Sequence, residues 1–186
     1  MAPTRQVLFI QGGGAGTHDH WDDKLVESLR RELGRGVDVR YPRMPDEGDP
    51  SPARWGRAIH RAIAELDAGA VVVGHSVGGA ILVNALAERE PEHELAAIVL
   101  VAAPFVGEGG WGGGELELPE DLGARLPQGA AVHVFHGLSD ETAPPGHADL
   151  YARAIPQARV HLLAGRDHQL NDDLSEVAEA IGAGGS

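Results

Sequence analysis

Three polar residues, far apart in the chain, have the types and the order that nucleophilic hydrolysis requires. The first, Ser76, lies in the motif G-x-S-x-G, which follows an apolar run and precedes a stretch with helical character. In that setting a sharp turn raises the serine hydroxyl above the carboxyl edge of a sheet, where it can attack a carbonyl carbon. The turn also directs the backbone N–H of Val77 into the same space, which predicts one donor of an oxyanion hole.

The motif needs partners, because a chain with 26 glycines in 186 residues contains it by chance in about one case in ten. A serine hydroxyl is a weak nucleophile at neutral pH, so it needs a base, and the base needs an orienting acid. In this setting the order along the chain is serine, acid, histidine. We therefore predict that Asp140 is the acid and that His168 is the base, which takes the proton of Ser76 and returns it to the leaving group.

Four neighbouring residues could compete for these roles, namely Glu141 and Asp167 for the acid and His136 and His147 for the base. Glu141 is the more serious rival acid, because Asp167 cannot easily reach the ring of the histidine next to it. One rival histidine precedes the acid in the chain, and the other lies on the next predicted helix. His75, inside the motif, should point away from Ser76 and is interpreted as structural.

Short apolar runs alternate with amphipathic stretches, and this alternation predicts the elements that position the three residues. The apolar runs predict strands at 7–10, 37–41, 70–73, 96–101, 131–135 and 159–163. Helical spacing predicts helices over 21–33, 52–66, 80–89, 148–155 and 174–181, with a short one near 119–126. The second of these should be capped by Ser51 with Pro52 at its first position, and 182–186 should form a frayed tail.

Strands separated by helices imply a parallel sheet covered on both faces, since parallel neighbours need crossover connections. The expected fold class is α/β, with one three-layer domain spanning 1–186 and the strand order 2-1-3-4-5-6. In that order the winding reverses between the first and third strands, and a doubly wound sheet binds its ligand at this point. The loop at 11–16 and the motif at 74–78 would meet there.

Composition limits the classes of partner and compartment. Asp and Glu outnumber Lys and Arg by 28 to 15, and the resulting net charge of −13 disfavours nucleic acid and anionic membranes as partners. Cysteine is absent, which excludes disulfides, thiolate metal sites and a cysteine nucleophile. The first apolar run is much shorter than the core of a signal peptide or a membrane span, so a cytoplasmic location is expected.

The chain resembles the α/β-hydrolases, and within that fold the compact serine hydrolases related to retinoblastoma-binding protein 9. The resemblance covers nearly the whole chain. The segments that carry it are the glycine-rich loop after the first strand, Gly74 to Gly79, Ala102-Ala103-Pro104-Phe105, Asp140 and Gly165-Arg166-Asp167-His168. It implies a cofactor-free hydrolase of the carboxylesterase type whose catalytic triad is Ser76, Asp140 and His168.

The resemblance also bears on the second oxyanion donor. Many relatives have a His-Gly pair after the first strand, and the next N–H completes the oxyanion hole. This chain has Gln11-Gly12 in that place. The donor then falls on Gly13 by position, with Gly12 and Gly14 as alternatives.

The pocket above Ser76 would be built by the loops at 12–20, 42–50 and 105–118. Gly12, His18 and Trp111 are the candidate substrate-binding residues. Trp111 either packs over an acyl group as part of a lid or anchors its glycine-rich loop. His18, Asp19 and His20 could suggest a metal site, but two histidines two residues apart on such a loop, without other ligands nearby, are more typical of a loop. No metal is therefore predicted, and Trp21 and Trp55 are expected in the core.

The expected function is hydrolysis of a small carboxylic ester through an acyl-enzyme, with a small-molecule acyl substrate as the partner. Amide, thioester and aminoacyl ester remain alternative substrates. A haloalkane dehalogenase is disfavoured because it would need aspartate at position 76. A non-catalytic binding or regulatory protein on the same scaffold is the alternative of another class, since a fold does not fix a function.

Overall fold

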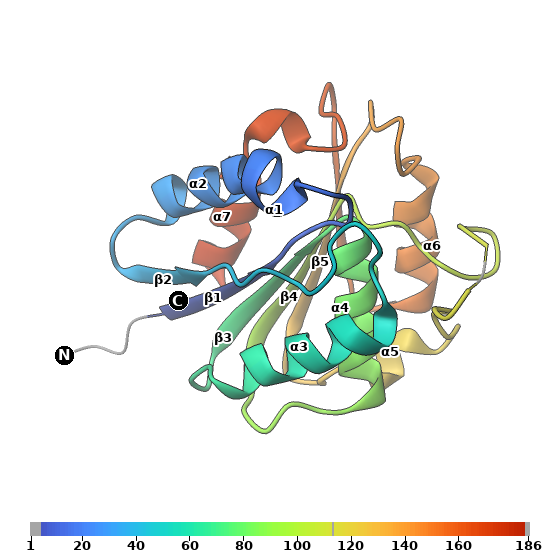
Figure 1. The fold of residues 1–186 in the computed structure, drawn as a ribbon, viewed down its shortest axis with the longest axis horizontal. Helices are drawn as coiled ribbons and strands as arrows, with labels where there is room; N and C mark the ends of the chain where they lie inside the picture. Colours follow the sequence, from blue (N-terminus) through green and yellow to red (C-terminus); the bar gives the residue numbers. More distant parts are fainter. Residues whose placement is uncertain (1–4, 113, 185–186) are drawn as a thin grey trace.

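The apolar runs form a parallel sheet in the order β2-β1-β3-β4-β5-β6, which confirms the predicted strand order (Figure 1). The computed structural model describes residues 5–112 and 114–184, and within these ranges the sheet has six strands. They are β1 (Arg5–Ile10), β2 (Val37–Arg40), β3 (Ala70–His75), β4 (Leu95–Val101), β5 (Ala131–Gly137) and β6 (Arg159–Leu163). The winding reverses between β1 and β3, so the loops that leave these two strands lie at the same edge of the sheet.

Helices cover both faces of the sheet, as parallel strands joined by crossovers require. In Figure 1 one face carries α2 (Asp22–Leu33) and α7 (Ser175–Ala183), and the other carries α3 (Pro52–Ala64), α4 (Val77–Glu88) and α6 (Gly146–Ala154). Shorter helical segments are α1 (Thr17–His20), α5 (Leu122–Arg125) and the 3-10 helix η1 (Leu170–Asp172). This is the predicted three-layer α/β fold.

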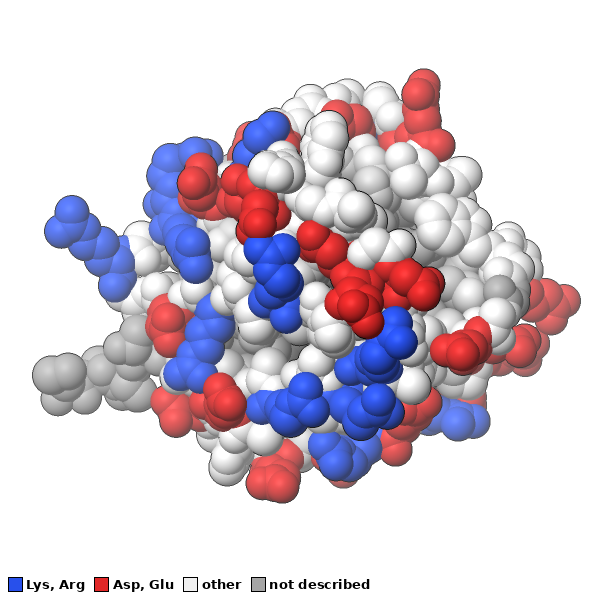
Figure 2. Space-filling model, viewed as in Figure 1, with Lys and Arg blue, Asp and Glu red and all other residues white. Residues whose placement is uncertain are grey.

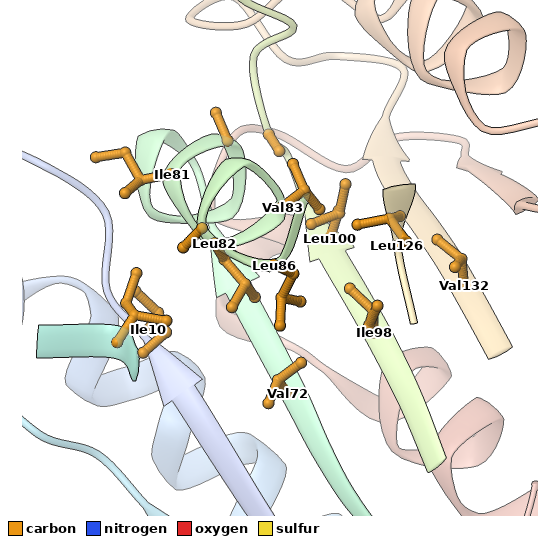
Figure 3. Packing of buried hydrophobic residues seen from close by; sticks show 14 of the residues in the cluster. Ile10, Val72, Ile81, Leu82, Val83, Leu86, Ile98, Leu100, Leu126 and Val132 are labelled. Carbon is orange, nitrogen blue, oxygen red and sulfur yellow. The ribbon is translucent and has the colours of Figure 1, made fainter. Parts of the chain in front are cut away.

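Apolar residues of the strands alternate between two hydrophobic clusters, one on each face of the sheet. In β1, Leu8 packs on the side of α3 and α4, whereas Val7 packs on the side of α2 and α7. Figure 3 shows the first cluster, in which side chains of α4 lie against strand residues that include Val72, Ile98 and Leu100. Because both faces are covered, the central strands are apolar at nearly every position.

The two tryptophans expected in the core differ in their burial. Trp55 on α3 is fully buried, and its indole N–H donates to the carbonyl of Pro45 at 2.7 Å. Trp21 is 56% exposed, so the prediction for Trp21 is wrong. The helical pattern breaks at this residue, because α1 ends at His20 and the backbone turns (φ −124°, ψ −61°) before α2 begins. The buried place at the start of α2 is taken by Asp22 instead.

Helix boundaries differ from the predicted ones by a few residues. The cap of α3 is as predicted, because the hydroxyl of Ser51 accepts the N–H of Arg54 at 3.4 Å and proline occupies the first helical position. The helix ends at Ala64, although Leu66 beyond it is still buried. At the other end of the chain, α7 continues to Ala183, so the prediction of a frayed tail is wrong for residues 182 and 183. Residues 185–186 of the predicted tail lie outside the described ranges.

Charged side chains of both signs are interspersed on the face of the molecule shown in Figure 2. Exposed ion pairs, such as that between Arg125 and Asp121 at 2.8 Å, contribute little to stability because water screens them. Within the residues that the structure describes, no helix is both long enough and apolar enough to cross a lipid bilayer.

The end of β1 is pressed against the elbow, which we define as Gly74 to Gly78. A Cβ atom added at Gly78 would collide with the carbonyl oxygen of Gln11, and one added at Gly74 would lie 2.5 Å from the Cα atom of Gly79. Both obstacles are backbone atoms, which cannot rotate away as a side chain can. Glycine therefore lets the first turn of α4 approach β1, and this approach places the loop after β1 beside Ser76.

Replacing Gly78 by alanine is expected to lower the free energy of unfolding by about 3 kcal/mol, the upper end of the usual cost of overpacking, because the colliding atom belongs to the backbone. In a chain of this length such a loss lowers the Tm by roughly 6–12 °C, which thermal unfolding followed by circular dichroism measures. The matched control is Gly129→Ala, since a Cβ atom there meets nothing within 4 Å. Equal Tm values for the two variants would contradict the role given to Gly78.

Candidate active site

Ser76 lies between β3 and α4 in a backbone conformation that residues other than glycine rarely adopt. Its φ is 52° and its ψ is −135°, a combination that costs on the order of 1–3 kcal/mol. Backbone contacts hold the turn, because the Ser76 N–H donates to the carbonyl of Val101 at 2.9 Å and the Ser76 carbonyl accepts the N–H of Gly79 at 2.9 Å. The sequence motif thus forms the sharp turn between strand and helix that its spacing predicts.

Ser76, His168 and Asp140 form one continuous hydrogen-bonded chain. The Oγ atom of Ser76 lies 2.9 Å from Nε2 of His168, and Nδ1 of that ring lies 2.8 Å from Oδ2 of Asp140. A carboxylate only accepts hydrogen bonds, so Nδ1 carries the proton and Nε2 is free to accept one from the serine. The loops after β3, β5 and β6 therefore bring the three predicted residues into the arrangement that general-base activation of a serine needs.

Asp140 is buried and is held as a carboxylate by hydrogen-bond donors on both of its oxygens. Oδ1 accepts the backbone N–H groups of Thr142 and Ala143, each at 2.8 Å, and Oδ2 lies 3.2 Å from Nε2 of His136 as well as near His168. Burial raises the pKa of Asp140, but the hydrogen bonds from His136 and His168 outweigh it, so the pKa lies well below its ordinary value. The carboxyl group of Asp140 is therefore ionised at neutral pH.

The four competing residues do not take the places of Asp140 and His168 in this series of hydrogen bonds. The side chain of Glu141 is exposed, and the carboxylate of Asp167 accepts two N–H groups of its own loop. His147 accepts the N–H of Phe105 on Nδ1 at 2.7 Å, which ties its ring to the segment after β4. His136 lies behind the acid, and its Nε2 is also 2.7 Å from a backbone carbonyl. Its ring therefore supports the carboxylate of Asp140.

The backbone donors beside Ser76 differ in what they already contact. The N–H groups of Gly12 and Gly14 donate to protein oxygens at 2.7 and 2.6 Å. The N–H of Gly13 has no acceptor among the described residues, and a Cβ atom added there would lie 2.8 Å from Cγ1 of Val77. Of the three glycines after β1, Gly13 is thus the one whose N–H has no acceptor in the described part of the chain, and its role as an oxyanion donor with Val77 stays a prediction.

The carboxylate of Glu47 braces residues 11–16. We call this segment the oxyanion loop, after the donor that the sequence predicts in it. The carboxylate accepts the backbone N–H groups of Gly16 at 2.8 Å and His18 at 3.0 Å and the side-chain amide of Gln11 at 2.7 Å. Burial raises the pKa of Glu47, but these hydrogen bonds outweigh burial and hold the pKa below its ordinary value. The carboxyl group is therefore ionised at neutral pH. These hydrogen bonds tie the loop after β1 to the loop after β2.

A cleft of about 450 Å³ opens beside the elbow. Val77 lies at its wall, together with the apolar side chains of Ile81, Val106, Trp111 and Leu116 and with polar residues that include Ser51 and Arg54. Trp111 packs edge-on against His147 with ring centroids 5.9 Å apart, and its backbone N–H donates to the carbonyl of Phe105 at 2.8 Å. Trp111 therefore anchors its loop and also lines the cleft, and its packing over an acyl group stays a prediction.

His18 is held by contacts within its own region. Its ring stacks on Tyr41 with centroids 4.1 Å apart, its Nδ1 lies 2.7 Å from Oδ1 of Asp19, and its Nε2 lies 3.3 Å from the carbonyl of Tyr41. The described residues contain no cluster of three or more side chains that could together hold a metal ion. These contacts give His18 a role in holding its loop, and its contact with a substrate stays a prediction.

Asp22 and Glu47 contribute to the site without belonging to any recognisable motif. Asp22 lies on the same face of α2 as Leu25 and Leu29, so a charged residue on a buried stripe was the signal available in the sequence. Glu47 lies in a proline-rich loop that has no periodicity. Nothing in the local sequence distinguishes it from a solvated acid.

Comparison with protein families assigns the chain to a known family. A family model described as serine hydrolase matches residues 7–173 of the chain. The chain belongs to the serine hydrolase family. The matched range contains Ser76, Asp140 and His168. None of the curated proteins compared with the chain matches it.

Several solved structures share the fold of this serine hydrolase. The ydeN gene product of B. subtilis has a TM-score of 0.77 and 21% identity, and the match covers 97% of this chain and 98% of that one. An esterase domain from a Rhodothermus marinus protein has a TM-score of 0.65 and 24% identity, covering 97% and 85%. XC6422 from Xanthomonas campestris, an α/β serine hydrolase without lid, has a TM-score of 0.66 and 16% identity, covering 99% and 82%. At these identities the likeness shows the fold.

Replacing Ser76 by glycine is expected to stabilise the protein relative to Ser76→Ala. Both variants lack the hydroxyl, but only glycine relieves the strain of the positive φ, and the relief exceeds the entropic cost of glycine by about 1 kcal/mol. The Tm of the glycine variant should then be higher by roughly 2–4 °C in thermal unfolding. A lower Tm for glycine than for alanine would show that the turn stores no strain at this residue.

Proposed function

We propose that the protein hydrolyses a small carboxylic ester through an acyl-enzyme formed on Ser76. The observation that carries the proposal is the chain of two hydrogen bonds from Ser76 through His168 to a buried, ionised Asp140, at 2.9 and 2.8 Å. A serine that served only to make a turn would need neither a base nor a charged acid behind that base. Membership of the serine hydrolase family supports the same conclusion.

The reaction follows from these positions. His168 removes the proton from the hydroxyl of Ser76 as Oγ adds to the ester carbonyl carbon, and the N–H groups of Gly13 and Val77 bind the oxygen that becomes negative. His168 then gives the proton to the departing alkoxide, which leaves as the alcohol. In the second half, water gives a proton to His168 and adds to the acyl-enzyme, and the returned proton restores the serine as the carboxylic acid leaves.

The cleft beside the elbow supports a small and partly apolar substrate. Its volume of about 450 Å³ and its aliphatic and aromatic lining suit a short acyl or alkyl group, and the polar residues Ser51 and Arg54 also line it. The resemblance to compact serine hydrolases related to retinoblastoma-binding protein 9 implies a cofactor-free hydrolase with this triad. Thioesters and activated amides have the same carbonyl chemistry and are the next substrates to compare.

A fluorophosphonate probe is expected to label the folded protein at Ser76, and short-chain p-nitrophenyl esters are expected to be hydrolysed. Ser76→Ala should lose the labelling and nearly all turnover without unfolding, because it removes the attacking oxygen and leaves the fold intact. Ser175→Ala makes the same change of hydroxyl to methyl on α7 and should keep both activities. Absence of labelling in folded wild-type protein would instead favour a non-catalytic protein on this scaffold.

Replacing Gly13 by alanine tests the proposed oxyanion donor. An added Cβ atom would lie 2.5 Å from Cγ of Pro50 and 2.8 Å from Cγ1 of Val77, so the loop must move away from the elbow. Loss of one oxyanion donor typically lowers kcat about 10²- to 10³-fold, and we expect a fall in that range with a smaller change in KM. Steady-state kinetics on one ester measure both constants. An unchanged kcat would exclude Gly13 as a donor.

A further inference from the structure

A second pair of aspartate and histidine lies buried behind the first. Nδ1 of His75 is 2.9 Å from Oδ2 of Asp22, and both side chains are almost completely removed from solvent. The ring of His75 lies 5.1 Å from the ring of His168, centroid to centroid. The residue inside the elbow motif that the sequence marks only as structural is therefore in contact with the catalytic loops.

Both ring nitrogens of His75 face atoms that only accept hydrogen bonds. Nδ1 faces the carboxylate of Asp22, and Nε2 is 3.1 Å from the backbone carbonyl of His168. A neutral imidazole has one N–H and could donate to one of these partners, leaving a lone pair against the other acceptor. Donation to both requires an imidazolium, whose charge the buried carboxylate neutralises.

Asp22 extends the same contacts to the other two loops of the site. Its Oδ2 accepts the backbone N–H of Gly12 at 2.7 Å, next to the proposed oxyanion donor. Its Oδ1 accepts the side-chain amide of Gln169 at 3.3 Å, one residue after the base. The pair of Asp22 and His75 thus joins the oxyanion loop, the elbow and the loop after β6 inside one small buried volume.

We propose that Asp22 and a doubly protonated His75 form a buried ion pair that fixes the backbone of His168 and so positions its imidazole against the serine hydroxyl. Asp22 and His75 are positioning residues, because neither contacts Oγ of the serine in the described structure. The proposal rests on the proposed hydrolase function for its kinetic consequences. The protonation of His75 does not depend on that function.

The electrostatic surroundings of His75 agree with this charge state. Burial alone would lower the pKa of His75, but the charge and hydrogen bond of Asp22 raise it above its ordinary value, and the carbonyl of His168 and the charge of Asp140 add to the effect. Burial alone would raise the pKa of Asp22, and the charge of His75 lowers it. The titratable groups that face His75 are thus Asp22, His168 and Asp140.

The ion pair gives stability a defined dependence on pH. The contribution of His75 is fully present below the ordinary pKa of 6.5 and is lost as pH rises through its raised pKa in the folded protein. The contribution of Asp22 is present above the ordinary pKa of 3.8 and is lost as pH falls through its lowered pKa. The pair therefore stabilises the site most between these two ordinary values and begins to weaken on the alkaline side.

Nuclear magnetic resonance of ¹⁵N-histidine-labelled protein reads the protonation of His75 directly. We expect one of the ten histidines to keep protons on both ring nitrogens at neutral pH and to show two slowly exchanging N–H signals. Both signals should disappear in His75→Gln and His75→Asn, which assigns them. A single protonated ring nitrogen on His75 at neutral pH would overturn the proposal, whether or not the protein hydrolyses esters.

Two amide variants separate the two halves of the bridge. The amide nitrogen of glutamine replaces Nε2 and can still donate to the carbonyl of His168, whereas that of asparagine replaces Nδ1 and can donate only to Asp22. We expect kcat to fall about 10²-fold in His75→Asn and about tenfold in His75→Gln, with KM changed less than about threefold, because only the position of the base is affected. Equal kcat values for wild type and both variants would overturn the positioning role.

Asp22→Asn tests the charge while keeping the size of the side chain. Its oxygen can still accept the N–H of Gly12, but the imidazolium loses its counter-charge, so we expect a fall in kcat of about tenfold or more and loss of the two-proton signal of His75. The matched control is Asp23→Asn, which makes the same change of charge on the same helix and should leave kcat unchanged.

Failure of the two ideas can be told apart. If folded wild-type protein neither hydrolyses esters nor reacts with the fluorophosphonate, the proposed function fails. The positioning role is then read from the backbone amide shifts of His168 in His75→Asn, and unchanged shifts overturn it. If the wild type is active and His75 is neutral, the positioning proposal alone fails.

Discussion

The close approach of the elbow to the end of β1 is the constraint on which the rest of the site depends. Gly78 lies directly against the carbonyl of Gln11, and no side chain fits between these two segments of backbone. The approach puts the oxyanion loop beside Ser76 and puts the start of α4 next to Gly13. A nucleophile and its oxyanion donors must agree in position to a fraction of an ångström, and backbone packing supplies that precision better than flexible side chains do.

Two buried carboxylates lie around this contact, and each has hydrogen-bond donors of its own. The acid of the predicted triad is stabilised by His136 and His168, and Asp22 is stabilised by His75 and by a backbone N–H of the oxyanion loop. Each carboxylate would be costly to bury alone, and each becomes tolerable because its partners are fixed by the surrounding strands. Asp140 thus keeps its charge through hydrogen bonds, whereas the charge of Asp22 would be neutralised by the proposed imidazolium of His75.

Much of the fold could be predicted because its signals are periodic and local. The apolar runs gave the strands within a few residues, and the strand order followed from the need for crossovers between parallel neighbours. Trp21 was mispredicted because the helical spacing continues through a residue at which the backbone changes direction. A helical pattern gives the period of a helix, but it does not show where two helices meet end to end.

Residue types and their spacing along the chain were enough to predict the class of the fold, the sharp turn at Ser76 and the order in which a serine, an acid and a histidine follow strands of one sheet. These features depend on residue type and spacing, which a single chain displays. Only the folded structure shows which of three glycines has an N–H without an acceptor among the described residues, which histidines contact Asp140 or Asp22, and that Asp22 and Glu47 brace the loops. Hydrogen bonds between loops depend on distances across the edge of the sheet. Their partners lie from 10 to 147 positions apart in the sequence, so no local pattern records those distances.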